Sequence, residues 1–180
     1  MRHRIFISAL LPNELKTKLT DFQSDFRNLN LRWAKPENLH LTLIFIGWAE
    51  ESEIITIKEV LKEISQSFSP FNLKLTRLSA GPNLKFPRMI WASGPQNQYL
   101  EKIYQDIKDN FIKLNIPLDE RHPFKIHITL ARAKDKELKG RNVKRTLDLS
   151  FFIREIALME SQLKTSGAEY EVLEKYSLKV

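Results

Sequence analysis

Apolar residues recur at intervals of three and four in three stretches of the sequence, and this spacing predicts three amphipathic helices. The predicted helices cover residues 12–29, 51–66 and 98–114. In the first of them, Leu15, Leu19 and Phe22 fall on one face of the helix. Each helix would therefore bury one side against the rest of the molecule and expose the other.

Between the helices, shorter apolar or alternating runs end at glycine and proline residues, which is typical of strands separated by turns. The predicted strands cover residues 4–10, 32–34, 39–46, 71–78, 88–93, 124–131, 147–159 and 169–179, and a hairpin loop is predicted at residues 161–168. Strand, helix and strand occur in that order twice, first over residues 4–46 and again over residues 88–131. This weak repeat predicts a duplicated fold with an approximate two-fold axis.

The second strand of each copy carries the same short phrase. It reads His40-Leu41-Thr42-Leu43 in the first copy and His127-Ile128-Thr129-Leu130 in the second. Because side chains alternate between the two faces of a strand, the histidine and the threonine of each copy share one face. Two such strands facing one another would present two imidazoles and two hydroxyls, which suit a phosphate group.

Histidine titrates near neutral pH, so one of a pair can accept a proton while the other donates one. Metal-free hydrolysis of a phosphodiester needs such a base and acid, together with donors to the non-bridging oxygens. A strained 2′,3′-cyclic phosphate is the easiest substrate for this chemistry, because ring opening relieves strain and water can attack. His40 and His127 are therefore the candidate catalytic residues, and Thr42 and Thr129 the candidate phosphate-binding residues.

Other interpretations of the histidines remain open at this point. A single His-x-Thr on an apolar strand is most often an ordinary strand histidine beside a good strand former. His3 and His122 do not repeat, and we expect them to be structural or exposed. A metal site would combine His122 and His127 with Asp119 or Glu120, but no HExxH or comparable cluster supports it.

Composition and charge restrict the class of protein. Hydrophobic residues make up 42% and charged residues 28% of the 180 residues, which is an ordinary globular balance. The absence of cysteine excludes disulfides, thiolate catalysis and cysteine-ligated zinc. No apolar run is long enough to span a membrane, and the first apolar stretch is a strand, not a signal peptide, so we expect no membrane partner and a cytoplasmic location.

The net charge of +7 is compatible with a polyanionic partner. Much of the excess falls after the second motif, from Arg132 to Arg145. A solvated connecting loop is the favoured interpretation of this basic stretch.

Taken with its flanks, the repeated motif resembles the 2H phosphoesterase superfamily, and within it the RNA 2′,3′-cyclic phosphodiesterases also described as 2′-5′ RNA ligases. The resemblance covers nearly the whole chain. The matching segments are RIFISALLP, RWAKPENLHLTLIFIG, FPRMIWA, HITLARAK and LMESQLKTSGAEYEVLEKYSL.

The resemblance implies an α+β fold in which residues 1–180 form one bilobal, duplicated domain. Two antiparallel sheets would line a central cleft, the helices would lie outside, and each half would carry one HxTx motif. The resemblance also implies that no metal or organic cofactor takes part. It assigns His40 as the general acid, His127 as the base that activates water, and a 2′-phosphomonoester as the product.

Thr42 and Thr129 would hold the phosphate, and Arg132 matches a phosphate-binding arginine of the family. Strict alternation puts Arg132 on the face opposite His127, so it reaches the site only if the strand ends or bulges nearby. The expected partner is an RNA or oligonucleotide with a 2′,3′-cyclic phosphate end, bound by a monomer. Two alternatives are a reversible 2′-5′ ligase acting on tRNA halves and a non-catalytic RNA-binding module.

Overall fold

The computed structural model describes residues 2–83, 85–118, 124–134, 136–164 and 167–179. Its helices fall where the apolar spacing predicts them. Their bounds are Asn13–Asp21 for α1, Glu51–Ser67 for α2 and Gln98–Lys113 for α3, with short 3₁₀ helices at Phe22–Phe26 (η1) and Pro36–Asn38 (η2). None of the described helices is long and apolar enough to cross a membrane.

Nine strands form two antiparallel sheets in the described part of the chain. Their bounds are Arg2–Ala9 (β1), Leu31–Trp33 (β2), Leu41–Glu50 (β3), Phe71–Gly81 (β4), Met89–Ser93 (β5), His127–Ala133 (β6), Arg145–Ile153 (β7), Glu155–Lys164 (β8) and Gly167–Ser177 (β9). The four-stranded sheet has the order β3-β1-β8-β9, and the five-stranded sheet has the order β2-β6-β5-β4-β7. The α+β architecture with two antiparallel sheets is thereby confirmed.

The strand order shows the duplication that the repeat predicts. In one sheet β3 pairs with β1, and in the other β6 pairs with β5. Each motif strand thus lies beside the first strand of its own half of the sequence repeat. The chain also exchanges strands between the halves. Strand β4 joins the second sheet, and β8 and β9 return to the first. The two motifs are therefore held by equivalent frames.

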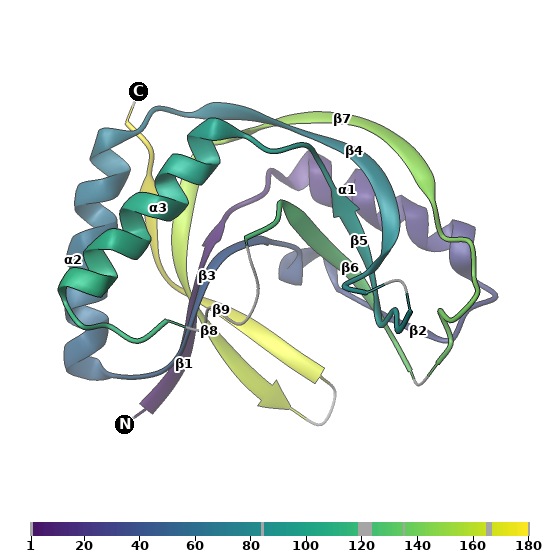
Figure 1. Ribbon diagram of the computed structural model, residues 1–180, viewed down its shortest axis with the longest axis horizontal. Helices are drawn as coiled ribbons and strands as arrows, with labels where there is room; N and C mark the ends of the chain where they lie inside the picture. Colours follow the sequence, from purple (N-terminus) through teal and green to yellow (C-terminus); the bar gives the residue numbers. More distant parts are fainter. Residues whose placement is uncertain (1, 84, 119–123, 135, 165–166, 180) are drawn as a thin grey trace.

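The helices lie outside the sheets. Helices α2 and α3 pack against each other at one end of the molecule, whereas α1 lies toward the other end (Figure 1). One large apolar cluster contains residues of both sheets and of all three helices, including Leu15, Ile57 and Ile107. Both sheets contribute side chains to this one core. Burial of these side chains therefore fixes the orientation of the sheets relative to each other.

One predicted strand is wrong. Residues 147–159 form not one strand but parts of two, because the chain leaves the five-stranded sheet after Ile153 and enters the four-stranded sheet at Glu155. The alternation of buried positions in β7 gives way to four consecutive buried residues from Ile156 to Met159, since β8 is a central strand. Hydrophobic periodicity reports burial but not the sheet in which a strand lies.

Other boundaries also differ from the predictions: β3 continues to Glu50, and β6 begins only at His127. The first helix ends as an α-helix at Asp21 and continues only as 3₁₀ helix, where the Ser24 hydroxyl donates to the Asp21 carbonyl. Such local bonds from serine compete with the α-helical pattern. The predicted loop at residues 161–168 is mostly strand, because β8 and β9 pair to their ends and Lys164 forms an ion pair with Glu169.

Candidate active site

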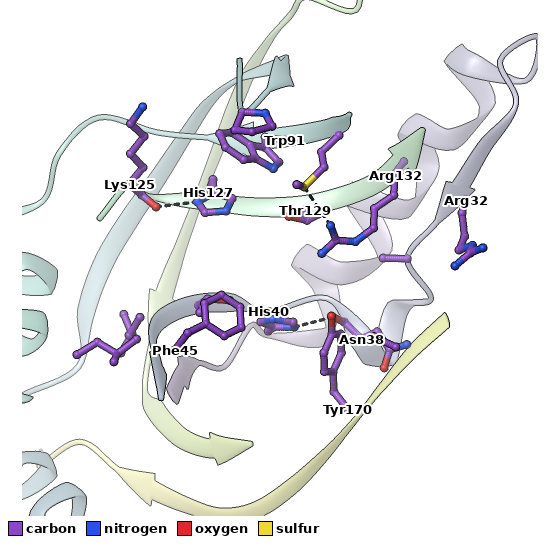
Figure 2. A pocket seen from close by; sticks show the side chains of 18 of the residues that line it. Arg32, Asn38, His40, Phe45, Trp91, Lys125, His127, Thr129, Arg132 and Tyr170 are labelled. Atoms are coloured by element: carbon purple, nitrogen blue, oxygen red, sulfur yellow. Dashed lines mark hydrogen bonds between the residues drawn. The ribbon is translucent and has the colours of Figure 1, made fainter. Parts of the chain in front are cut away.

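A cleft of about 800 Å³ lies between the two sheets, and the five predicted site residues line it. They are His40, Thr42, His127, Thr129 and Arg132. Figure 2 shows that the two imidazoles face one another across this cleft, one from each sheet. The predicted residues come together although the two motifs lie far apart in the sequence.

His40 lies immediately before β3 and is held by its own chain. Its Nδ1 is 2.7 Å from the carbonyl oxygen of Asn38. The imidazole also packs against two aromatic rings, with centroid distances of 5.0 Å to Phe6 and 4.8 Å to Tyr170. Tyr170 meets it edge to face at 78°. The ring is thus fixed by one hydrogen bond and a partly enclosing aromatic wall.

His127 opens β6 and repeats the same backbone arrangement. Its Nδ1 is 2.8 Å from the carbonyl oxygen of Lys125, again two residues earlier. Its aromatic neighbour is Trp91 of β5, whose ring centroid lies 4.2 Å away. The indole covers Gly81, where a Cβ would lie 2.6 Å from the ring. Glycine at this position therefore allows Trp91 to lie beside His127.

The two hydrogen bonds determine how the imidazoles can act. A carbonyl oxygen only accepts, so Nδ1 of each histidine carries the proton and donates it. The neutral ring then has its lone pair on Nε2, and the charged ring has its second N–H there. Both histidines can consequently exchange a proton with a ligand through Nε2.

The environment favours the neutral form of both rings. The pKa of His40 falls from its ordinary 6.5 to about 4, mainly through burial and also through the positive charges of His127, Lys16 and Arg132. Burial also lowers the pKa of His127, with Lys125 and Arg132 acting in the same direction. The hydrogen bonds to the carbonyls oppose both shifts. A bound anion would favour the charged forms and raise both pKa values.

The threonines provide neutral donors beside the histidines. Thr42 and Thr129 line the cleft, and neither hydroxyl makes a hydrogen bond to another described residue. A hydroxyl can rotate to donate to a ligand oxygen. The two side chains are thus available to an oxyanion between the imidazoles.

Arg132 reaches the cleft because the strand does bulge. Ala131 pairs with Ile90 and Thr129 with Trp91, so Leu130 is an extra residue in β6. This β-bulge breaks the strict alternation of faces between Thr129 and Arg132. The guanidinium donates to Met89 Sδ at 3.4 Å, on the same side as Thr129 (Figure 2).

Several lining residues were missed by the sequence analysis. Trp91 and Tyr170 flank the histidines, and Arg32, Lys35 and Lys125 add positive charge. No described residue of the basic stretch after Lys134 lines the cleft. Apart from Arg132, the positive charge of the cleft thus comes from residues outside the basic stretch.

Within the described ranges, no group of three or more histidine, aspartate or glutamate side chains could hold a metal ion. The metal alternative combines His127 with His122 and with Asp119 or Glu120, and all of these except His127 lie outside the described residues.

Fold and site together define the class of protein. Two antiparallel sheets enclosing paired His-x-Thr motifs are the arrangement of a 2H phosphoesterase. Residues 10–91 match the family model described as LigT like Phosphoesterase.

The chain is 30% identical to the RNA 2′,3′-cyclic phosphodiesterase of Thermus thermophilus, covering 98% of this chain and 90% of that protein. It is 29% identical to the protein of the same name from Methanocaldococcus jannaschii, covering 96% and 99%. The chain belongs to the LigT-like phosphoesterase family and is a phosphoesterase.

Solved structures share the fold. The crystal structure of TT0787 of Thermus thermophilus matches with a TM-score of 0.88 and 30% identity, over 98% of both chains. Escherichia coli LigT, crystallised in complex with 3′-AMP, matches with a TM-score of 0.81 over 99% of both chains, at 22% identity. The duplicated two-sheet architecture is therefore that of this family.

Proposed function

We propose that the protein hydrolyses the 2′,3′-cyclic phosphate at the end of an RNA chain to a 2′-phosphomonoester, without a metal ion. The observation that carries this proposal is the pair of imidazoles in one cleft, each with Nδ1 bound to a backbone carbonyl and Nε2 available. The names of the relatives support the substrate class.

In the proposed reaction a water oxygen attacks the phosphorus and forms a new P–O bond. Nε2 of His127 accepts the proton of that water, and the bond from phosphorus to the 3′ oxygen breaks. Nε2 of His40 donates a proton to the departing 3′ oxygen, so the phosphate stays on the 2′ oxygen. Afterwards His127 is charged and His40 neutral, and exchange with solvent restores the starting state.

Thr42, Thr129 and Arg132 are the proposed ligands of the non-bridging oxygens. Their donors would stabilise the charge that develops on these oxygens in the transition state. The bound phosphate would also supply the negative charge that His40 needs to hold its proton, given the lowered pKa of the free protein. Substrate binding and protonation of the acid would therefore be coupled.

We further propose that residues 1–180 work as one catalytic unit, to which each half contributes one motif. The apolar core shared by both sheets supports this, since a rigid relation between the halves keeps the two imidazoles at a fixed separation.

The test is product analysis by phosphorus NMR after incubation with nucleoside 2′,3′-cyclic phosphates in the presence of chelator. We expect a 2′-phosphate with undiminished rate in chelator. A 3′-phosphate would reverse the assigned roles, and loss of activity that added metal restores would contradict the metal-free reaction. Variants His40→Ala and His127→Ala should each be folded and nearly inactive.

A further inference from the structure

Two arginines lie directly opposite each other at one end of the cleft. Arg32 of β2 is the cross-strand partner of Arg132 of β6, and both side chains line the cleft. Opposite residues of an antiparallel pair have Cα atoms about 5 Å apart and side chains on the same face. The cleft thus has two arginine side chains on the same face of neighbouring strands at this end.

The described part of the protein does not neutralise this pair. Neither arginine forms an ion pair with a described carboxylate. Among the described residues that line the cleft, the one carboxylate, Glu169, is paired with Lys164. Like charges directly opposite each other destabilise a sheet. The pair is therefore unfavourable in the free protein and becomes favourable when an anion lies between or beside the guanidinium groups.

Arg32 lies farther from the histidines than Arg132 does. His127, Thr129 and Arg132 follow one another along β6, and Arg32 lies on the neighbouring strand β2 (Figure 2). Arg132 is thus the arginine next to the HxTx residues, and Arg32 is one strand beyond it. A second anion bound by Arg32 would be a neighbour of the phosphate held by the histidines and threonines.

The other end of the cleft is less suited to a second phosphate. There Phe124 precedes Lys125 and stacks on Tyr104, with ring centroids 4.8 Å apart and planes at 12°. Leu118 and Phe45 add apolar surface to the same cleft. Lys125 is the one cation among these residues, so a charged backbone leaving the site is better stabilised by the two arginines at the opposite end.

We propose that Arg32 binds the internucleotide phosphodiester on the 5′ side of the terminal nucleotide, while Arg132 stays with the terminal phosphate. This inference rests on the proposed function, because it takes an RNA end as the ligand. A nucleoside cyclic phosphate lacks the second anion. Arg32 therefore makes the protein select RNA chains over mononucleotides.

The test uses binding of three ligands that end in the same 2′-phosphate. They are adenosine 2′-phosphate, the dinucleotide ApA with a terminal 2′-phosphate, and the same dinucleotide with a neutral methylphosphonate linkage. In calorimetric titrations, Arg32→Gln should weaken binding of the charged dinucleotide by roughly tenfold, as expected for loss of a charge-assisted contact. Binding of the other two ligands should change less than about twofold.

Salt dependence gives a second readout. The slope of log affinity against log salt concentration for the charged dinucleotide should fall by roughly 0.7, the value for one phosphate contact on a single strand. Arg32→Lys should retain part of the affinity, because lysine keeps the charge but not the planar fork.

Arg27→Gln is the matched control. It removes the same charge from an exposed arginine five residues earlier that does not line the cleft. We expect binding of all three ligands to be unchanged. The melting temperature of Arg32→Gln without ligand should be no lower than that of the wild type, since the substitution relieves a like-charge pair.

Equal weakening of all three ligands by Arg32→Gln, or no weakening of the charged dinucleotide, would overturn the inference. Failure of the proposed function looks different. The wild-type protein would then not hydrolyse cyclic-phosphate ends, yet Arg32→Gln would still weaken binding of the charged dinucleotide alone. That result would support the phosphodiester site and contradict the hydrolytic function.

Discussion

The two halves of the cleft hold their histidines by the same hydrogen bond to the backbone but in different surroundings. In both, Nδ1 donates to the carbonyl two residues earlier. His40 is the more deeply buried and lies against Phe6 and Tyr170, whereas His127 lies against Trp91. Duplication thus preserved the tautomer and the direction of Nε2, while neighbouring strands made the two imidazoles chemically unequal.

The largest expected effect tests whether that inequality is functional. His40→Asn and His127→Asn should each lower kcat/KM by about 10³ on a cyclic nucleotide, a typical loss for an acid or base. A substrate with sulfur at the 3′ bridging position separates them, because a thiolate leaves without a proton. This substrate should restore kcat/KM of the His40→Asn variant to within about tenfold of the wild type, whereas kcat/KM of His127→Asn should stay low.

Equal rescue of both variants would contradict separate roles for the two histidines. Circular dichroism of each variant serves as the folding control. The pH profile of kcat/KM gives the same comparison in another form. Loss of the acid should remove the fall in rate at high pH, and loss of the base should remove the rise at low pH.

The second prediction concerns the support of His127. Gly81→Ala should destabilise the protein by about 1–3 kcal/mol, the usual cost of overpacking, because the new Cβ would lie 2.6 Å from the Trp91 ring. A displaced indole should also lower kcat by about tenfold through misplacement of His127. Urea unfolding and steady-state kinetics measure the two effects.

Gly140→Ala is a comparison variant of the same chemistry, with no atom near its Cβ but with a positive φ of 73°. It should lose stability through backbone strain and keep kcat. If Gly81→Ala also keeps kcat, Trp91 does not position His127.

The third prediction follows from the lowered pKa of His40. The unfolded chain binds a proton at the ordinary pKa of 6.5, but the folded protein binds it only near pH 4. Between these values the unfolded state holds more protons, so stability decreases as pH falls. Through this histidine, lowering the pH from about 7.5 to about 5 should reduce the free energy of unfolding by about 2 kcal/mol.

Urea unfolding at the two pH values measures this loss, and His40→Asn should remove most of it. His127→Asn should reduce the pH dependence as well, since its pKa is lowered by the same cause. A wild-type stability that does not decrease between these pH values would contradict the burial of a neutral His40.

The sequence alone predicts the elements that depend on local pattern. Helices α2 and α3 were predicted to within one residue, because their apolar faces repeat with a regular spacing. The repeated HxTx phrase likewise identified both histidines and both threonines of the cleft. These features require no knowledge of which strands pair.

Features that arise from strand pairing could not be predicted. The bulge at Leu130 that brings Arg132 to the cleft depends on how β6 meets β5. Arg32 joins the site only because β2 pairs with β6, and Tyr170 only because β9 extends the first sheet. The switch of sheets near Arg154 has the same origin. Local hydrophobic patterns do not record such long-range contacts.

The smallest expected effect concerns the aromatic wall around His40. Tyr170→Ala should lower the free energy of unfolding by about 1 kcal/mol, because it removes edge-to-face contacts with His40 and Phe6. It should also raise the pKa of His40 toward its ordinary value, since water replaces the ring and solvates the imidazolium.

NMR titration of the imidazole protons reports the pKa values of both histidines at once. The pKa of His127, on the opposite wall, should not move. Tyr170→Phe keeps the ring and should leave both titrations unchanged. If the pKa of His40 stays lowered in Tyr170→Ala, the burial that lowers it comes from other neighbours such as Phe6 and not from Tyr170.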